Sequence, residues 1–179
     1  MSRDSLDRYY TPQPLADRLV PLLPIRQEQT AWEPAAGGGA FVIALQRACT
    51  DVMATDLDPA AYGSAGVFDF LSMQVGRRAD WIVTNPPEQN GSKTATLWCE
   101  QAIRHSRIGA ALLVRSAVYQ RLSDFALDHC VARYALKERP EFEGPAREGK
   151  GAGARYDYDF LVFSHARFGP AVSRCISWR

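Results

Sequence analysis

The chain has 179 residues, of which 46% are hydrophobic and 23% charged, and this size and composition suit one globular domain. The net charge of +1, from 21 Lys and Arg against 20 Asp and Glu, excludes a strongly basic nucleic-acid-binding protein, and the absence of any CxxC pair argues against a zinc site or a redox motif. Neither an apolar signal region nor a run of membrane-spanning length occurs, so we expect a cytoplasmic protein with reduced thiols, no membrane contact and no metal site.

Short apolar segments alternate with helical patterns along the chain. The expected strands lie at 31–33, at 52–56, in a short segment ending near Asp69, and at 80–84, 108–114, 131–136 and 159–164. Helical spacing predicts helices that begin after Gly39, cover 94–105 and cover 118–129. This alternation predicts an α/β fold in which residues 1–179 form a single domain, a doubly wound, mainly parallel seven-stranded sheet.

A glycine-rich loop follows the first expected strand, with the sequence EPAAGGGAF over residues 33–41. Consecutive glycines let the backbone turn sharply and approach a ligand where a side chain would clash. A plain tight turn and a dinucleotide site are the alternatives, but the dinucleotide pattern needs a small residue where Val42 stands. The acid before the loop, Glu33, suits a cationic amino-acid ligand better than a pyrophosphate.

Two acidic positions follow the next strands. Asp56 lies 19 positions after Gly37, where a carboxylate can accept hydrogen bonds from both ribose hydroxyls of an adenosine. The second acid of this segment, Asp58, is expected to cap a helix. Asp69 and Phe70 form an acid–aromatic pair that could contact an adenine ring, a weak signal by itself.

The segment Asn85-Pro86-Pro87-Glu88 directly follows the buried strand 80–84. Two prolines fix the backbone and hold the preceding carbonyl groups rigidly. The side-chain oxygen of Asn85 can accept a hydrogen from an amino group of a substrate. At this position in the fold the pattern favours a catalytic loop over a structural one.

Together these motifs resemble those of a known family. DRYYTP at 7–12, EPAAGGGAF at 33–41, TDLDP at 55–59, DFL at 69–71 and TNPP at 84–87 come in the order and spacing of amino-methyltransferases. The chain looks most like the DNA adenine methyltransferases, including the small phage and prophage kind. The resemblance covers Asp7 to about Leu113. The segments ERPEF and YDYDFLVF resemble the family more weakly.

The resemblance implies the Rossmann-like fold of class I methyltransferases and S-adenosylmethionine as the cofactor. Asp7, Tyr9, Thr11 and Pro12 match the N-terminal segment that closes over the methionine part of the cofactor. The other matched positions are Glu33, Ala35, Gly37 and Gly39 for the methionine-binding turn, Asp56 for the ribose, Leu57, Asp69 and Phe70 for the adenine, and Asn85, Pro86 and Pro87 for the catalytic loop, with Asn85 also beside the cofactor.

One position departs from the family pattern. An aromatic residue that stacks on the extruded base follows the two prolines in the family, and Glu88 stands here. The expected reaction is methylation of an adenine amino group in nucleic acid, most simply DNA, otherwise RNA. The alternatives are methylation of a protein glutamine or another amide or amine, and a catalytically weak partner subunit that binds the cofactor.

The last quarter of the chain has a modest basic bias. Residues 133–179 carry nine Lys or Arg and six Asp or Glu. Between the last two expected strands lies a Gly-rich, charged loop at about 143–155, which we expect to be mobile. This loop is the sequence's best candidate for contacting a polymeric substrate.

Overall fold

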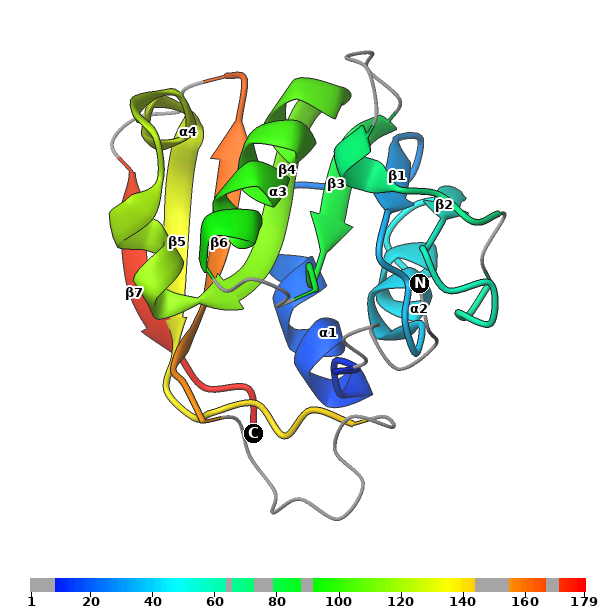
Figure 1. Ribbon diagram of the computed structural model, residues 1–179, viewed down its shortest axis with the longest axis horizontal. Helices are drawn as coiled ribbons and strands as arrows, with labels where there is room; N and C mark the ends of the chain where they lie inside the picture. Colours follow the sequence, from blue (N-terminus) through cyan, green and yellow to red (C-terminus); the bar gives the residue numbers. More distant parts are fainter. Residues whose placement is uncertain (1–8, 64–65, 73–78, 88–91, 144–154, 167–170) are drawn as a thin grey trace.

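The computed structural model describes residues 9–63, 66–72, 79–87, 92–143, 155–166 and 171–179. Seven strands form one sheet in the order β2-β1-β3-β4-β6-β5-β7 (Figure 1). All neighbouring strands are parallel except β6, which runs antiparallel to β4 and to β5. The strands are β1 (Thr30–Glu33), β2 (Asp51–Ala54), β3 (Ala79–Thr84), β4 (Ser106–Arg115), β5 (Cys130–Leu136), β6 (Tyr158–Ser164) and β7 (Val172–Ile176).

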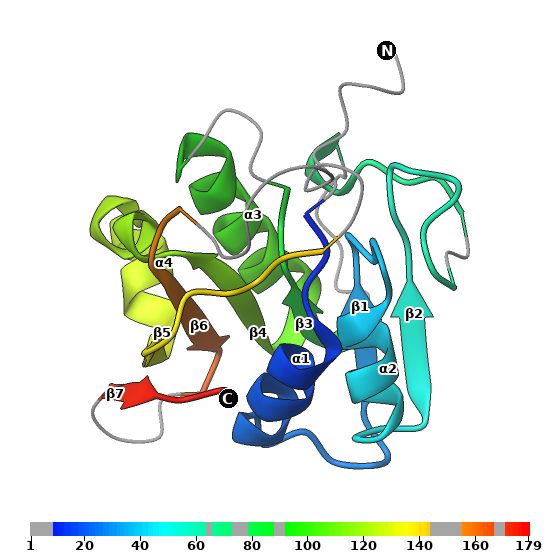
Figure 2. The same ribbon diagram turned by 90° about the horizontal axis from the view of Figure 1, so that it is seen from below.

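Helices cover both faces of the sheet, as Figure 2 shows. One face carries α1 (Gln13–Leu19) and α2 (Ala40–Gln46), and the other carries α3 (Ser92–His105) and α4 (Asp124–His129). Each layer has its own apolar core, because alternate residues of the central strands point to opposite faces. Val83 and Leu113 belong to the core under α1 and α2, whereas Ile82 and Leu112 belong to the core under α3.

The predicted doubly wound α/β fold with a seven-stranded sheet is confirmed, but one of the seven strands was wrong. The segment before Asp69 forms only an isolated bridge between Val67 and Asp56, and Phe70 begins a short 3-10 helix, η3 (Phe70–Ser72). The seventh strand is instead β7, at the opposite edge of the sheet. Four of its five residues are exposed, so it lacks the apolar pattern on which the strand prediction relied.

The helical prediction for 118–129 also needs correction. This stretch contains a 3-10 helix, η4 (Ser116–Arg121), and then α4, which begins after Ser123. The Ser123 hydroxyl caps α4 by accepting the amide hydrogen of Ala126 at 3.4 Å, and it donates to Glu100 at 2.6 Å. A side-chain cap of this kind marks the start of a new helix. Among the described residues, no helix combines the length and apolarity needed to cross a membrane.

The parallel strands place the sequence motifs at one edge of the sheet. β1, β2, β3 and β4 run in the same direction, so their carboxyl ends share an edge. Glu33 ends β1, Asp56 follows β2 and Asn85 follows β3. In open α/β sheets, ligands bind at this edge.

Candidate functional site

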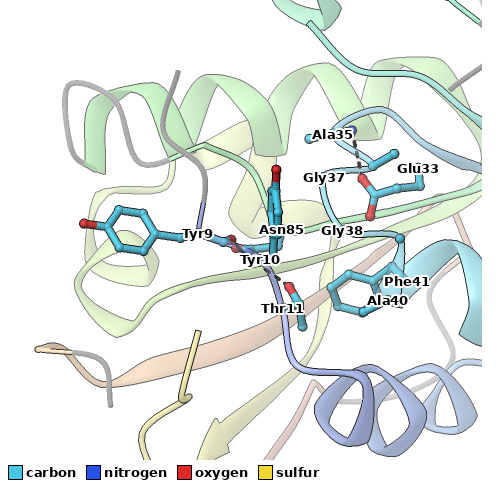
Figure 3. Close-up of a pocket in the computed structure, with 12 residues that line it drawn as sticks. Tyr9, Tyr10, Thr11, Glu33, Ala35, Gly37, Gly38, Ala40, Phe41 and Asn85 are labelled. Atoms are coloured by element: carbon cyan, nitrogen blue, oxygen red, sulfur yellow. Dashed lines mark hydrogen bonds between the residues drawn. The ribbon is translucent and has the colours of Figure 1, made fainter. Parts of the chain in front are cut away.

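A pocket opens at the carboxyl edge of β1 and β3, beneath the N-terminal segment (Figure 3). Three parts of the chain form its wall: the N-terminal segment, the glycine loop with the start of α2, and the residue after β3. The lining residues are Tyr9, Tyr10, Thr11, Glu33, Ala35, Ala36, Gly37, Gly38, Gly39, Ala40, Phe41 and Asn85. The pocket therefore joins sequence motifs that are more than 70 positions apart.

The glycine loop adopts a backbone that other residues rarely take. Gly37 and Gly39 have positive φ angles of 49° and 88°. A Cβ atom on Gly39 would lie 2.3 Å from the ring of Tyr62, and one on Gly37 would lie 3.0 Å from the ring of Tyr10. Conformation and space both require glycine here, because L-residues are strained at these angles and a side chain would collide with the two rings.

Glu33 lies under this loop at the end of β1 and is only 1% exposed. Its Oε1 accepts the backbone N–H of Ala35 at 2.9 Å. Burial raises the pKa of Glu33 well above its ordinary value, and the hydrogen bond from the Ala35 N–H offsets this only in part. A buried carboxylate with so little solvation is a strong partner for a cationic group placed beside it.

Asp56 connects the loop after β2 to the glycine loop. Its Oδ2 accepts the backbone N–H of Gly37, and its Oδ1 accepts that of Asp58, both at 2.8 Å. Each carboxylate oxygen retains capacity for a further hydrogen bond. Next to it, the apolar side chain of Leu57 is 43% exposed. A charged acceptor and an apolar surface thus stand together at the end of β2.

The side chain of Asn85 is held by hydrogen bonds to the N-terminal segment. Its Nδ2 donates to the Thr11 hydroxyl at 3.1 Å and to the Tyr9 carbonyl at 3.4 Å. With the amide nitrogen engaged in this way, the Oδ1 atom is turned from the segment and can accept a hydrogen from another group. Pro86, next in the chain, is buried.

The two neighbouring tyrosines take different roles. The Tyr9 ring points away from the glycine loop (Figure 3) and packs edge-on against Phe142, with ring centroids 6.4 Å apart. The Tyr10 ring lies against Gly37 and Gly38. Sequence reasoning selected Tyr9 and missed Tyr10, and also missed Tyr62, which closes the other side of the loop. An aromatic pair before Thr-Pro gives no signal for which ring faces the loop.

The N-terminal segment is itself tied to a distant part of the chain. The backbone N–H of Tyr10 donates to the Glu143 carbonyl and the Glu143 N–H donates to the Tyr10 carbonyl, both at 2.8 Å. This isolated antiparallel bridge is reinforced by the contact between Tyr9 and Phe142, which in turn packs on Tyr158. The ERPEF segment therefore supports the segment that holds Asn85.

Of the remaining predicted site residues, Asp69 is exposed and its Oδ1 accepts the Leu71 N–H at 3.1 Å. The ring of Phe70 is 1% exposed and lies in the core, where it packs on Trp32 and Trp98. This ring serves the core rather than a ligand surface. The predicted positions Asp7, Glu88 and 144–154 of the expected basic loop lie outside the described residues, and in the described part no group of His, Cys, Asp and Glu could hold a metal ion.

No protein-family model and no curated protein matches the chain in sequence. Solved structures match its fold. A protein from Pyrococcus horikoshii described as a "putative RNA methyltransferase" has a TM-score of 0.70 at 18% identity, over 92% of this chain and 89% of that one. A "putative class I S-adenosylmethionine-dependent methyltransferase" from Listeria monocytogenes has a TM-score of 0.66 at 15% identity, and the match covers 96% of this chain and 67% of that one.

The M protein of the type I restriction enzyme EcoKI also matches, with a TM-score of 0.64 at 18% identity. The match covers 90% of this chain but only 45% of the M protein. At identities this low, the matches establish the fold. The chain has the fold of the class I methyltransferases.

Proposed function

We propose that this chain, a class I methyltransferase by its fold, transfers a methyl group from S-adenosylmethionine to the exocyclic amino group of adenine in nucleic acid, most simply DNA. The observation that carries the proposal is the Asn85-Pro86 segment, held at the carboxyl end of β3 with the Asn85 amide nitrogen bonded to Thr11. Solved structures of the same fold include a type I restriction enzyme M protein and a described RNA methyltransferase, which supports a nucleic-acid acceptor.

The residues of the pocket fit this cofactor. Glu33 offers a buried carboxylate to the ammonium group of the methionine part. The Asp56 carboxylate, one strand away, offers acceptors to the ribose hydroxyls, and the exposed Leu57 covers one face of the adenine. The glycine loop turns sharply at the pocket, with the rings of Tyr10 and Tyr62 lying against it. S-adenosylmethionine supplies an already activated methyl group on a sulfonium.

The chain's own contribution is to prepare and align the acceptor nitrogen. The lone pair of an adenine amino group is delocalised into the ring, which makes it a poor nucleophile. The Asn85 Oδ1 and the Pro86 carbonyl accept the two amino hydrogens, so the lone pair is localised on nitrogen and the developing positive charge is stabilised. Alignment of this nitrogen with the methyl group would supply much of the rate enhancement. The N–C bond would form as the C–S bond breaks, S-adenosylhomocysteine would leave, and the methylated nitrogen would lose one proton.

The test is a transfer assay in which S-adenosylmethionine with a labelled methyl group is offered to DNA, RNA and protein fractions. We expect label in DNA, recovered after nucleoside digestion as N6-methyladenine, and no label with the Asn85→Ala variant. Label confined to protein would replace this proposal with methylation of a glutamine or another amide. Cofactor binding without transfer to any fraction would make the chain a cofactor-binding partner subunit.

A further inference from the structure

We infer that Arg115 and Tyr156 form a stacking platform for an unpaired base of a single-stranded nucleic acid, next to the catalytic loop. The inference rests on the proposed function, because it assigns the acceptor side of that site. The guanidinium carbon of Arg115 lies 4.1 Å from the centroid of the Tyr156 ring. Tyr156 is 45% exposed, so much of the ring remains accessible although one face is covered by Arg115.

The strand order places this pair on the acceptor side. The loops that would hold the cofactor follow β1 and β2, and Asn85 follows β3. On the other side of β3 lies β4, which Arg115 ends, and then β6, which begins two residues after Tyr156. The catalytic loop therefore stands between the cofactor side and the Arg115–Tyr156 pair.

The alternation of the strands places the pair on the same face of the sheet as Asn85. Val83 in β3, Leu113 in β4 and Phe160 in β6 all belong to the core under α1 and α2. Asn85, Arg115 and Tyr158 lie two residues closer to the carboxyl edge of β3 and β4 than these three core residues. Arg115 is paired with Tyr158 in the register of β4 and β6. Side chains two apart share a face of a sheet. Tyr156 continues this row beyond Tyr158.

The strand register also sets the distance between Asn85 and Arg115. Thr84 pairs with Leu112, so Arg115 lies two positions beyond Asn85 along the strand direction and one strand across. At about 3.3 Å per residue and about 4.8 Å between strands, Arg115 is on the order of 10 Å from Asn85. That separation matches a base one or two nucleotides from the one whose amino group lies at Asn85.

The charges around the pair favour a polyanion. Arg155, directly before Tyr156 in the chain, is exposed. The two acids that follow Tyr156 in the described chain are matched, Asp157 by Arg139 at 2.9 Å and the buried Asp159 by Arg133 at 2.6 Å. An arginine stacked on a tyrosine beside a second, exposed arginine is the chemistry that holds single-stranded nucleic acid, in which bases stack on aromatic rings and phosphates contact arginines.

The experiment measures binding of a fluorescein-labelled single-stranded DNA of roughly twelve nucleotides by anisotropy, on the full chain without cofactor. We expect Tyr156→Ala to weaken binding roughly tenfold and Tyr156→Phe to retain it, because the ring, not the hydroxyl, stacks. Arg115→Gln should weaken binding and reduce its dependence on salt concentration. The matched control is Arg104→Gln, which removes a second arginine–aromatic pair, with Phe125, at 4.5 Å near the start of β4 at the opposite edge.

Cofactor affinity of each variant, measured by titration calorimetry, separates this inference from the proposed function. Wild-type affinity for S-adenosylmethionine in Tyr156→Ala shows that the fold and the cofactor site are intact. Equal loss of DNA binding in Arg104→Gln and Tyr156→Ala, or no loss in Tyr156→Ala, would overturn the platform. DNA binding that depends on Tyr156 in a chain with no affinity for S-adenosylmethionine would uphold the platform and remove the proposed function.

Discussion

The side-chain amide of Asn85 donates to the hydroxyl of Thr11 at 3.1 Å, a bond between the residue after β3 and a segment 74 positions earlier in the chain. The Tyr9 carbonyl, which can only accept, lies 3.4 Å from the same amide nitrogen and fixes which atom of the amide faces the N-terminal segment, and the Thr11 hydroxyl supports that orientation. Since an amide can present either its oxygen or its nitrogen to a substrate, its orientation decides whether it accepts or donates. Thr11 is therefore a positioning residue for the proposed reaction.

Replacement of Thr11 by Val should lower kcat, because the isosteric side chain cannot accept the Asn85 N–H. Loss of one hydrogen bond of about 1 kcal/mol predicts a decrease of roughly fivefold to tenfold. Thr11→Ser keeps the hydroxyl and should restore the rate. Steady-state kinetics on both variants checks this, and a raised KM with unchanged kcat in Thr11→Val would show that Thr11 only binds cofactor.

Asn85→Ala should abolish methyl transfer while leaving the affinity for S-adenosylmethionine nearly unchanged. The proposed partner of the Asn85 oxygen is the acceptor amino group, which is absent when the cofactor binds alone. Calorimetry for binding and a radiolabel assay for transfer measure the two effects separately. Normal turnover by the variant on its true substrate would make the loop structural.

Asp56→Ala should weaken S-adenosylmethionine binding by on the order of 1.5–3 kcal/mol, because the ribose hydroxyls lose a charged acceptor. It should also lower the melting temperature, since the amides of Gly37 and Asp58 lose their partner. Asp51→Ala is the matched control, because Asp51 lies exposed at the other end of β2. Unchanged affinity in a folded Asp56→Ala protein would contradict the ribose assignment.

Glu33→Gln should change how stability depends on pH. The pKa of Glu33 is raised in the folded protein because the carboxyl group is buried, so the folded state favours the neutral form. Its contribution to the free energy of unfolding is therefore fully present below the unfolded-state pKa, near 4.5, and is lost as the pH rises through the raised folded-state pKa. Gln keeps an oxygen for the Ala35 N–H and carries no such dependence.

The measurement is urea denaturation of wild type and Glu33→Gln at several pH values from 5 upward. The variant should gain stability relative to wild type as the pH rises, although its affinity for S-adenosylmethionine should fall with the loss of the carboxylate. A stability difference that does not vary with pH would mean that Glu33 is not the titrating group. An unchanged affinity would remove it from the cofactor site.

The sequence predicts much of the fold, because a buried strand or helix must carry apolar residues in a recognisable pattern. The segment at 108–114 is almost wholly apolar because β4 lies in the middle of the sheet with both faces covered. The strand β7 could not be found in this way, because it pairs only with β5 at the edge and most of its side chains face solvent. Its position depends on backbone pairing, which leaves little trace in side-chain chemistry.

The site was predictable where glycine, proline and acids stand directly at strand ends. The glycine loop and Asn85 could be placed because each follows a strand in sequence, and parallel strands end together. The role of Tyr10 could not be predicted, because it depends on a bridge to Glu143 that brings together distant parts of the chain. The ring of Phe70 was expected at the end of a strand, but no strand forms there and the ring packs into the core, an orientation that only tertiary packing decides.

The bridge between Tyr10 and Glu143 has a consequence for the order in which the molecule is assembled during synthesis. Tyr10 leaves the ribosome near the start of translation, but its partner follows more than 130 residues later, which at 5–20 residues per second is roughly ten seconds. The first residues made are thus among the last to dock. β6 (Tyr158–Ser164), which lies between β4 and β5 in the sheet, is also made after Glu143, so neither the sheet nor the bridge that supports the Asn85 segment is complete until nearly the whole chain is present.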